Sequence, residues 1–320
     1  ALLSSPSSLI FWHTLFLSIT VFVVARGILD GLEKWINTLM PMLFVIVLLL
    51  CLYATQSGAF IEGLIYLFQP DFSKITPEVM LEALGQAFFT LSLGMGTMIT
   101  YGSYLNKKQN LLTSALWVIF LDTAIAILAG VAIFTTVFAL GANPAEGPGL
   151  IFVILPSIFP QLAGGVLWST LFFILLFMAA LTSAISILEV VTAYFIDQKG
   201  WSRKKATIQF GLVITVVGVF CSLSLGGGIN ITAPLGMSFF DAMDYLSSKY
   251  MLPIGGMLTA IFIINKWGIK EYMLELKQGM NGAEIHEGLV KIFLLIAASI
   301  VAFIIFNEIY FSLFGKALIG

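Results

Sequence analysis

Two glycines, Gly94 and Gly96, interrupt the apolar run FFTLSLGMGTMITYGSYL. Each glycine costs a helix about 1 kcal/mol relative to alanine, so two within three residues favour local unwinding. Unwinding frees backbone carbonyls and amides, and beside Thr90 and Ser92 these groups could hold a polar solute or an ion. The alternative is that the glycines let a neighbouring helix pack closely, as small residues do in membranes.

A carboxylate, Asp122, stands well inside the next apolar run, WVIFLDTAIAILAG. A charged side chain near the bilayer centre costs at least about 2.5 kcal/mol, so a functional partner is the default expectation. A bound cation is the simplest such partner. A protonated Asp122, hydrogen-bonded to a neighbouring helix, is the structural alternative.

The run MAALTSAISILEVVTAYFID carries a stripe of small and polar residues. Its members recur at i, i+3, i+4 and i+7: Ala179, Thr182, Ser183 and Ser186. Asp197 follows about five turns beyond Ala179 on the same helix face. Hydroxyls and carbonyls are the hard oxygen ligands that suit an alkali cation, although such stripes also simply pack helices. Glu189 falls off the stripe and could be a structural carboxylate paired with another side chain, so we assign it no functional role.

A weak point is also predicted at RGILDGLEKWINTLMPML, where Gly31 and Pro41 stand ten residues apart. Pro41 removes a backbone donor and Gly31 weakens the helix start, so this end should fray and could admit water. A simple kinked helix is the alternative.

The composition requires that these residues be positioned by membrane helices. The chain is 59% apolar and only 10% charged, which lies outside the range of soluble domains. Apolar runs of about 20 residues favour helical spans, because hydrocarbon offers no partner for free backbone groups. The net charge of −2 and the lack of a basic stripe give no reason to expect nucleic acid as a partner. Cys51 and Cys221 fall inside apolar spans, so we infer neither a disulfide nor a metal site.

The sequence predicts about eight transmembrane helices. They are Leu9 to Ala25, Trp35 to Ala54, Gly85 to Leu105, Leu111 to Leu140, Val166 to Ile196, Ala206 to Leu225, Phe239 to Ile264 and Leu289 to Leu313. Twelve of the fifteen Lys and Arg residues lie at alternate connections, which we therefore expect to face the cytoplasm. The opposite connections hold only Lys74, Lys249 and Lys316. This orientation places Ala1 outside, so we expect a further portion of the protein to precede it.

Four segments in order resemble the neurotransmitter:sodium symporter family, and in particular its bacterial multi-hydrophobic amino acid transporters. GQAFFTLSLGMGTMITYGSYL resembles the family's broken sixth helix, LTSAISILE its eighth, FFDAMDY the start of its tenth, and RGILDGLEKWINTLMP its fourth-to-fifth connection. A glycine pair alone would be weak, but this ordered set is specific. The family is itself the standard example of a transporter with discontinuous helices.

The resemblance implies an all-α polytopic membrane protein with the inverted-repeat (5+5) sodium symporter fold. The chain would form a single transmembrane domain, 1–320, that corresponds to helices four to eleven of the family. Within it, 1–84 would end the first repeat and include an outer loop, 85–265 would form the second five-helix repeat, and 266–320 would add a further helix. The first three helices would be the chain's partners within the same protein.

Site residues carry over only where the motifs match. The substrate pocket would be lined by Phe89, Thr90, Ser92, Gly94, Met95, Gly96, Ser183 and Ile187. One sodium ion would bind Thr90 and Asp122, and a second would bind the Ala179 carbonyl, Thr182 and Ser183. Gating roles would fall to Gln86 and Asp244 on the outside, and to Ser103, Tyr104 and Asp197 on the inside. Gly31 and Pro41 would unwind the family's fifth helix.

Two departures from the family pattern are informative. Many members have an aromatic ring where Met95 stands, so the flexible thioether predicts a pocket that tolerates varied apolar side chains. Many members have Asn where Asp122 stands, and animal members use chloride nearby. A fixed carboxylate could replace that anion, so we expect that chloride is not required.

These features predict sodium-coupled symport of hydrophobic L-amino acids by alternating access, with no enzymatic chemistry. The protein would lie in the lipid bilayer as a multi-pass protein of the cell membrane, namely a bacterial inner membrane. The alternatives are a proton-coupled amino-acid permease, or a non-transporting channel or receptor-like membrane protein.

Overall fold

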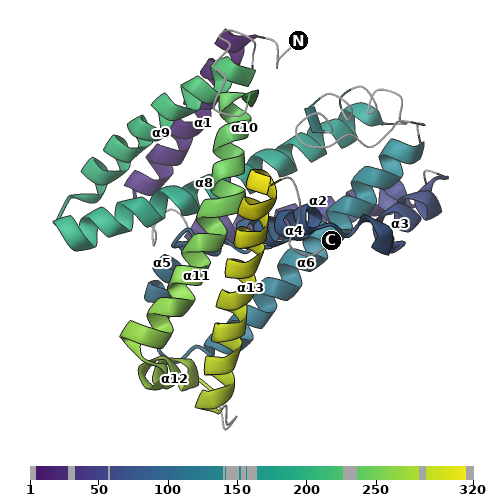
Figure 1. The fold of residues 1–320 in the computed structure, drawn as a ribbon. Coiled ribbons are helices and arrows are strands. Elements are labelled where there is room, and N and C mark those ends of the chain that lie inside the picture. Colours follow the sequence, from purple (N-terminus) through teal and green to yellow (C-terminus); the bar gives the residue numbers. More distant parts are fainter. Residues whose placement is uncertain are drawn as a thin grey trace. The chain divides into compact units, whose positions relative to one another are not determined.

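The computed structural model describes residues 5–27, 33–56, 58–139, 141, 151–152, 156, 164–225, 236–280 and 286–314. Its elements are helices, labelled in Figure 1. In order they are α1 (Pro6–Ala25), α2 (Glu33–Ala54), α3 (Phe60–Phe68), η2 (Phe72–Lys74), α4 (Pro77–Thr90), α5 (Thr97–Tyr104), α6 (Leu111–Ala139), α8 (Gly165–Lys199), α9 (Arg203–Leu225), α10 (Phe239–Tyr245), η6 (Leu246–Met251), α11 (Leu252–Phe262), η7 (Ile263–Trp267), α12 (Ile269–Lys277) and α13 (Glu287–Phe314).

Six helical stretches of the described residues are long and apolar enough to cross a membrane. They are Pro6–Ala25, Leu111–Ala139, Gly165–Lys199, Arg203–Leu225, Phe239–Trp267 and Glu287–Asn307. They correspond to six of the eight predicted spans. The other two predictions fall on α2, whose apolar part is the shorter Met40–Ala54, and on the α4–α5 pair, which is interrupted.

The predicted start of the interrupted span was wrong, because α4 begins at Pro77 rather than at Gly85. Thr76 caps this helix, and its side chain accepts a hydrogen bond of 3.3 Å from the Val79 amide. Proline at the helix start has the backbone angle that a first turn needs. Local capping chemistry therefore extends the helix beyond the apolar run.

The chain divides into two compact units, each described here by itself. The first unit comprises Ala1–Ala25, Phe72–Ile119 and Ser186–Gly320, and the second comprises Arg26–Asp71 and Phe120–Ile185. The core of the second unit includes Val137 and Phe172, with Trp168 packed against them.

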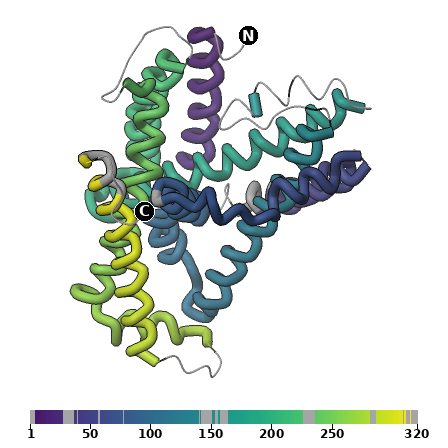
Figure 2. Tube along the Cα trace, turned by 45° about the vertical axis from the view of Figure 1, so that its right-hand side comes forward, coloured from purple at the N-terminus to yellow at the C-terminus, as the bar shows by residue number. Residues whose placement is uncertain are grey.

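In the first unit, α1 and α9 lie side by side, as do α11 and α13 (Figures 1 and 2). Two glycines of α9 allow the first of these contacts, because a Cβ at Gly211 would meet Val21 and a Cβ at Gly218 would meet His13. Small residues at such positions bring helices close in membrane proteins, where packing rather than the hydrophobic effect joins them.

The helix from Phe239 to Trp267 is not regular, because η6 is a π-helical stretch between α10 and α11. Pro253, in the first turn of α11, has no amide hydrogen and cannot donate to the carbonyl four residues earlier, that of Lys249. The wider helical turn at η6 accommodates this missing bond. Such π-helical turns are frequent at functional sites.

Candidate functional site

The helix break predicted from the glycine pair is confirmed. The first half, α4, ends at Thr90, and α5 begins at Thr97. Between them Ser92, Gly94 and Gly96 have φ angles of 54°, 77° and 87°. These left-handed conformations end the helix, and a residue other than glycine adopts them only at a cost.

The break is held by backbone contacts with α11. A Cβ at Gly94 would collide with the Leu252 carbonyl, and a Cβ at Gly255 would collide with the Gly94 carbonyl. Gly256 lies against the Phe88 ring in the same way. Both alternatives predicted for the glycines therefore occur together: the glycines interrupt the helix, and they also let α11 pack closely against it.

The predicted substrate residues of the first unit flank this break. Phe89 is 53% exposed and Thr90 is exposed, whereas Ser92 and Met95 are half-buried. Sequence reasoning missed Thr97, the first residue of α5. Its hydroxyl is buried, and within the described residues it has no hydrogen-bond partner. A β-branched polar residue directly after a glycine pair is the signal that could have pointed to it.

The predicted cation ligands on α6 and α8 belong to the second unit. Asp122 is half-buried about three turns into α6. On α8, the Thr182 hydroxyl donates to the Ala179 carbonyl at 3.0 Å, and its side chain is buried. Ser183 beside it is exposed. The structure thus brings together two of the three oxygens proposed for the second sodium ion.

Pro41 stands inside α2, which continues through it, and Gly31 lies outside the described residues. The role of this pair in unwinding remains a prediction.

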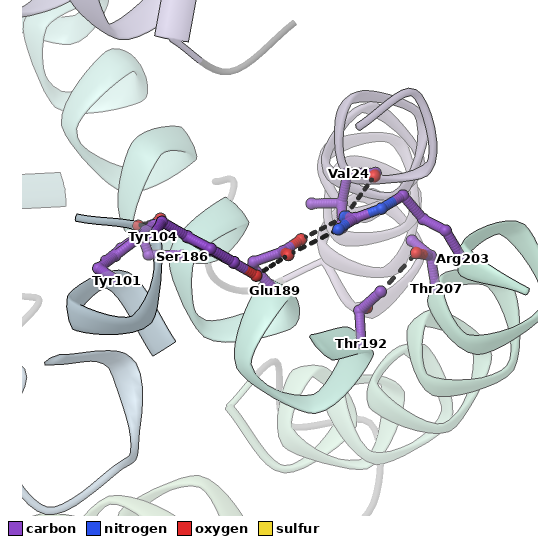
Figure 3. A network of polar contacts seen from close by, with 8 residues as sticks. All are labelled: Val24, Tyr101, Tyr104, Ser186, Glu189, Thr192, Arg203 and Thr207. Carbon is purple, nitrogen blue, oxygen red and sulfur yellow. Dashed lines mark hydrogen bonds and ion pairs between the residues drawn. The ribbon is translucent and has the colours of Figure 1, made fainter. Parts of the chain in front are cut away.

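A buried charge network joins α5, α8 and α9 at the predicted cytoplasmic side (Figure 3). Glu189 is 1% exposed and accepts hydrogen bonds from the two terminal guanidinium nitrogens of Arg203. Arg203 Nη1 lies 2.6 Å from Oε2, and Nη2 lies 3.0 Å from Oε1. The Tyr104 hydroxyl donates to Glu189 Oε1 at 2.9 Å. Arg203 also donates to the Val24 carbonyl at 3.4 Å, which ties the network to α1.

A second hydroxyl contact lies next to this network, since Tyr101 donates to Ser186 at 2.7 Å (Figure 3). Of the predicted inner-gate residues, Tyr104 takes part, but Ser103 instead donates to the Thr100 carbonyl at 2.6 Å. Asp197 is exposed about two turns beyond Glu189 on α8. The interpretation of Glu189 as a paired structural carboxylate agrees with this ion pair, but sequence reasoning missed its partner Arg203, because the pairing depends on which faces of two helices meet.

At the other end of the first unit, a cavity of about 250 Å³ brings the predicted outer-gate residues together. It is lined by Glu82, Gly85, Gln86, Phe89, Asp244, Ser248 and Lys249. Asp244 Oδ1 accepts from the Ser248 hydroxyl at 3.1 Å. Lys249 and Glu82 form an ion pair of 3.2 Å, which the sequence did not predict.

Comparison with solved structures identifies the fold. The chain matches the crystal structure of MhsT in complex with L-phenylalanine with a TM-score of 0.86 and 42% sequence identity. The match covers 95% of this chain and 69% of that one. It confirms the predicted class, an all-α polytopic membrane fold of the sodium symporter type.

Curated relatives agree with this match. The chain is 38% identical to the uncharacterized sodium-dependent transporter YhdH of Bacillus subtilis, over 89% of this chain and 63% of the relative. It is 33% identical to an uncharacterized sodium-dependent transporter of Methanocaldococcus jannaschii, over 81% of this chain and 54% of that relative. The chain therefore spans between half and two thirds of the length of these relatives.

The family model for sodium:neurotransmitter symporters matches residues 6–314, which is nearly the whole chain. Its members are multi-pass membrane transporters and not enzymes, in agreement with the apolar helices found here. The broken helix, the apolar spans and these matches lead to one conclusion: the chain belongs to the Sodium:neurotransmitter symporter family.

Proposed function

We propose that the protein to which this chain belongs is a sodium-coupled symporter of hydrophobic L-amino acids that works by alternating access in the cell membrane. The observation that carries this proposal is the break between Thr90 and Thr97 in a chain of this family. Irregular backbone at membrane depth is tolerated where it lines a cavity, and its free carbonyls and amides can hold a charged solute.

The ions would be held by hard oxygen ligands. Thr90 and Asp122 would serve one sodium ion, next to the substrate carboxylate. The Ala179 carbonyl and the Thr182 hydroxyl, 3.0 Å apart, would serve the second together with Ser183. The Thr182 hydroxyl would only have to rotate its proton away from the carbonyl to present a lone pair. The names of the curated relatives, both sodium-dependent transporters, support this choice of ion.

The substrate side chain would lie against Phe89, Met95 and Ile187, and its polar end against Ser92 and the backbone near Gly94 and Gly96. Two observations support a hydrophobic amino acid. MhsT, which is 42% identical, was solved with L-phenylalanine. Phe89 and Ile187 are 53% and 45% exposed, so the aromatic ring of Phe89 and the branched side chain of Ile187 are both accessible to a ligand.

Sodium would drive accumulation without covalent chemistry. Each ion that enters along the membrane potential releases about 2.3 kcal/mol per 100 mV. In the family pattern, the other broken helix and the arginine that pairs with Asp244 come from three preceding helices. Their presence in this protein remains a prediction.

The direct test is uptake of labelled leucine or tryptophan into proteoliposomes that contain the full-length protein, under an imposed sodium gradient. We expect accumulation with sodium outside and only background with choline. Uptake that is unchanged in choline and follows an imposed pH gradient instead would favour a proton-coupled permease, with Asp122 as the proton carrier. Binding without uptake would favour a receptor-like protein.

We also expect transport that does not need chloride, because the carboxylate of Asp122 would balance the charge of the bound sodium ion. The same assay with gluconate in place of chloride should give the same uptake rate. A loss of uptake in gluconate would contradict this role of Asp122.

A further inference from the structure

We propose that Lys249 and Glu82 act as positioning residues for transport, forming a latch that joins the outer half of α4 to η6 and favours the closed state of the cavity that Phe89 lines. We call this pair the outer latch. The inference rests on the proposed function for its role in transport, but the latch itself can be tested without any uptake.

The two residues of the latch differ in their surroundings, because Lys249 is mostly buried and Glu82 is mostly exposed. Lys249 is only 16% exposed, and its ammonium lies 4.9 Å from the centre of the Tyr245 ring and 3.2 Å from Glu82 Oε1. The attraction between an ammonium group and an aromatic face restricts where the ammonium group can lie. Glu82 is 58% exposed and reaches across from α4. Water and salt keep such a pair weak, which suits a contact that must open in every cycle.

The latch is separate from the predicted gate at Asp244. Of the residues that line the cavity, Lys249 is the cation, and Glu82 and Asp244 are the carboxylates. Asp244 Oδ1 is engaged by the Ser248 hydroxyl at 3.1 Å, whereas Lys249 pairs with Glu82. The cavity therefore contains two distinct polar contacts, one within the helix from Phe239 and one that joins it to α4.

The contacts between α4 and its neighbours change along the helix. Near the break, the backbones of Gly94 and Gly255 touch. Gly85 is close to the Ser248 carbonyl, where an added Cβ would lie 2.9 Å from the oxygen. Beyond Gly85, Glu82 adds the side-chain ion pair with Lys249, the neighbouring Leu81 is fully buried, and α4 also packs against α13. Opening this part of α4 would therefore break the ion pair and also loosen the packing around Leu81.

The break supplies a pivot for that motion. Residues at the ends of helices are the usual places where a hinge absorbs changes in φ and ψ. At 1.5 Å per residue, Glu82 stands about 12 Å from the end of α4 at Thr90, so a rotation of about 15° about that end would move it by about 3 Å. That displacement would be enough to separate the ion pair. Phe89 lines the same cavity between the latch and the break and is already 53% exposed, so opening the latch would expose it further.

The test uses the full-length protein with Gln86→Cys as a reporter inside the cavity. Its reaction with a membrane-impermeant thiol reagent is followed by mass spectrometry, which separates it from Cys51 and Cys221. Lys249→Met and Glu82→Gln should each raise the rate of labelling about two- to fivefold, in sodium buffer with leucine, because a weak exposed pair contributes a factor of this size. The exchanged pair Glu82→Lys/Lys249→Glu should bring the rate part of the way back to that of the reporter alone, because it restores the ion pair but not the contact of a cation with the Tyr245 ring.

Glu78→Gln is the matched control, because it removes the same charge from the same helix one turn earlier and outside the cavity lining. It should leave the labelling rate unchanged. If the exchanged pair does not fold, raising the salt concentration should speed labelling of the reporter alone but not of Lys249→Met. Equal rates in all variants, or an exchange that makes labelling still faster, would overturn the latch.

Uptake kinetics provide the second readout. If the latch stabilises the closed state after binding, Lys249→Met should raise the KM for leucine about two- to fivefold and change the maximal rate much less. Labelling does not depend on uptake, so a failure of the sodium-gradient assay would reject the proposed function and leave the latch testable. An unchanged labelling rate with normal sodium-driven uptake would reject only the latch.

Discussion

At the scale of single residues, Glu189 is a deeply buried carboxylate with hydrogen-bond donors at both of its oxygens. It is 1% exposed, and it receives three hydrogen bonds from Arg203 and Tyr104. Burying a carboxylate is costly unless it is paired, and removing one partner leaves the other uncompensated. The two partners are not equivalent, because Arg203 is 27% exposed and can turn toward water.

This asymmetry predicts different losses of stability. Arg203→Met should lower the free energy of unfolding by about 3 kcal/mol, because it leaves Glu189 buried without its cation. Glu189→Gln should cost less, about 1 to 2 kcal/mol, because the freed guanidinium can be solvated. Thermal unfolding of the purified protein, followed by tryptophan fluorescence, should place the midpoint of Arg203→Met lowest. The double variant should recover part of that loss, and an equal loss in both single variants would contradict the argument.

Met95 is proposed to line the substrate pocket, and its substitution tests the range of substrates that the pocket accepts. A thioether side chain has more rotatable bonds than an aromatic one and can fill gaps of varied shape. Met95→Phe should therefore reduce uptake of tryptophan about tenfold but uptake of leucine less than threefold. The added ring would leave less room in an apolar pocket for the larger substrate. Competition between the two amino acids in the proteoliposome assay gives the ratio. A uniform reduction for both would argue that Met95 does not face the substrate.

At the scale of elements, the break between α4 and α5 depends on glycine at one position more than at others. Gly94 has a φ of 77°, and an added Cβ would run into the Leu252 carbonyl. Gly102, within α5, has an ordinary helical conformation, and an added Cβ there would meet nothing within 4 Å. The same substitution therefore has opposite effects at two sites eight residues apart.

Gly94→Ala should destabilise the protein by at least about 2 kcal/mol, through the left-handed backbone and the collision with backbone atoms that cannot move aside. Gly102→Ala should be neutral or stabilise the protein by up to about 1 kcal/mol, because alanine favours the helix. Unfolding midpoints and yields of monodisperse protein would give the comparison. A tolerant Gly94→Ala variant would show that the close approach of α11 is not needed.

At the scale of the whole molecule, the lysines and arginines predict which connections face the cytoplasm. Lys199 and Arg203 flank the short connection between α8 and α9, whereas the opposite side holds few cations. The orientation follows from the energy of moving positive side chains across a polarised membrane.

Cysteine labelling in intact cells tests this orientation. A membrane-impermeant maleimide should react with Gln69→Cys, at the end of α3, without permeabilisation. Gln198→Cys, at the exposed end of α8, should react only after the cells are permeabilised. The two sites control for each other, and the reverse pattern would mean that the orientation is inverted.

Some features of the protein could be read from the sequence because they are local. The apolar runs predicted six long helices with ends correct to within three residues, since burial of backbone groups in hydrocarbon requires helices of that length. The glycine pair predicted the break, because left-handed backbone is a property of glycine itself. The hydroxyl stripe on α8 brought Thr182 next to the Ala179 carbonyl through helix periodicity alone.

Other features were decided only by the tertiary structure. The sequence suggested that Glu189 is a paired structural carboxylate but not which residues pair with it, because its contacts with Arg203 and Tyr104 appear only when α5, α8 and α9 meet. The Glu82–Lys249 pair likewise joins residues 167 apart, across two helices. Side-chain pairing between helices depends on which faces are turned toward each other, and the hydrophobic periodicity of a nearly all-apolar helix does not encode that rotation.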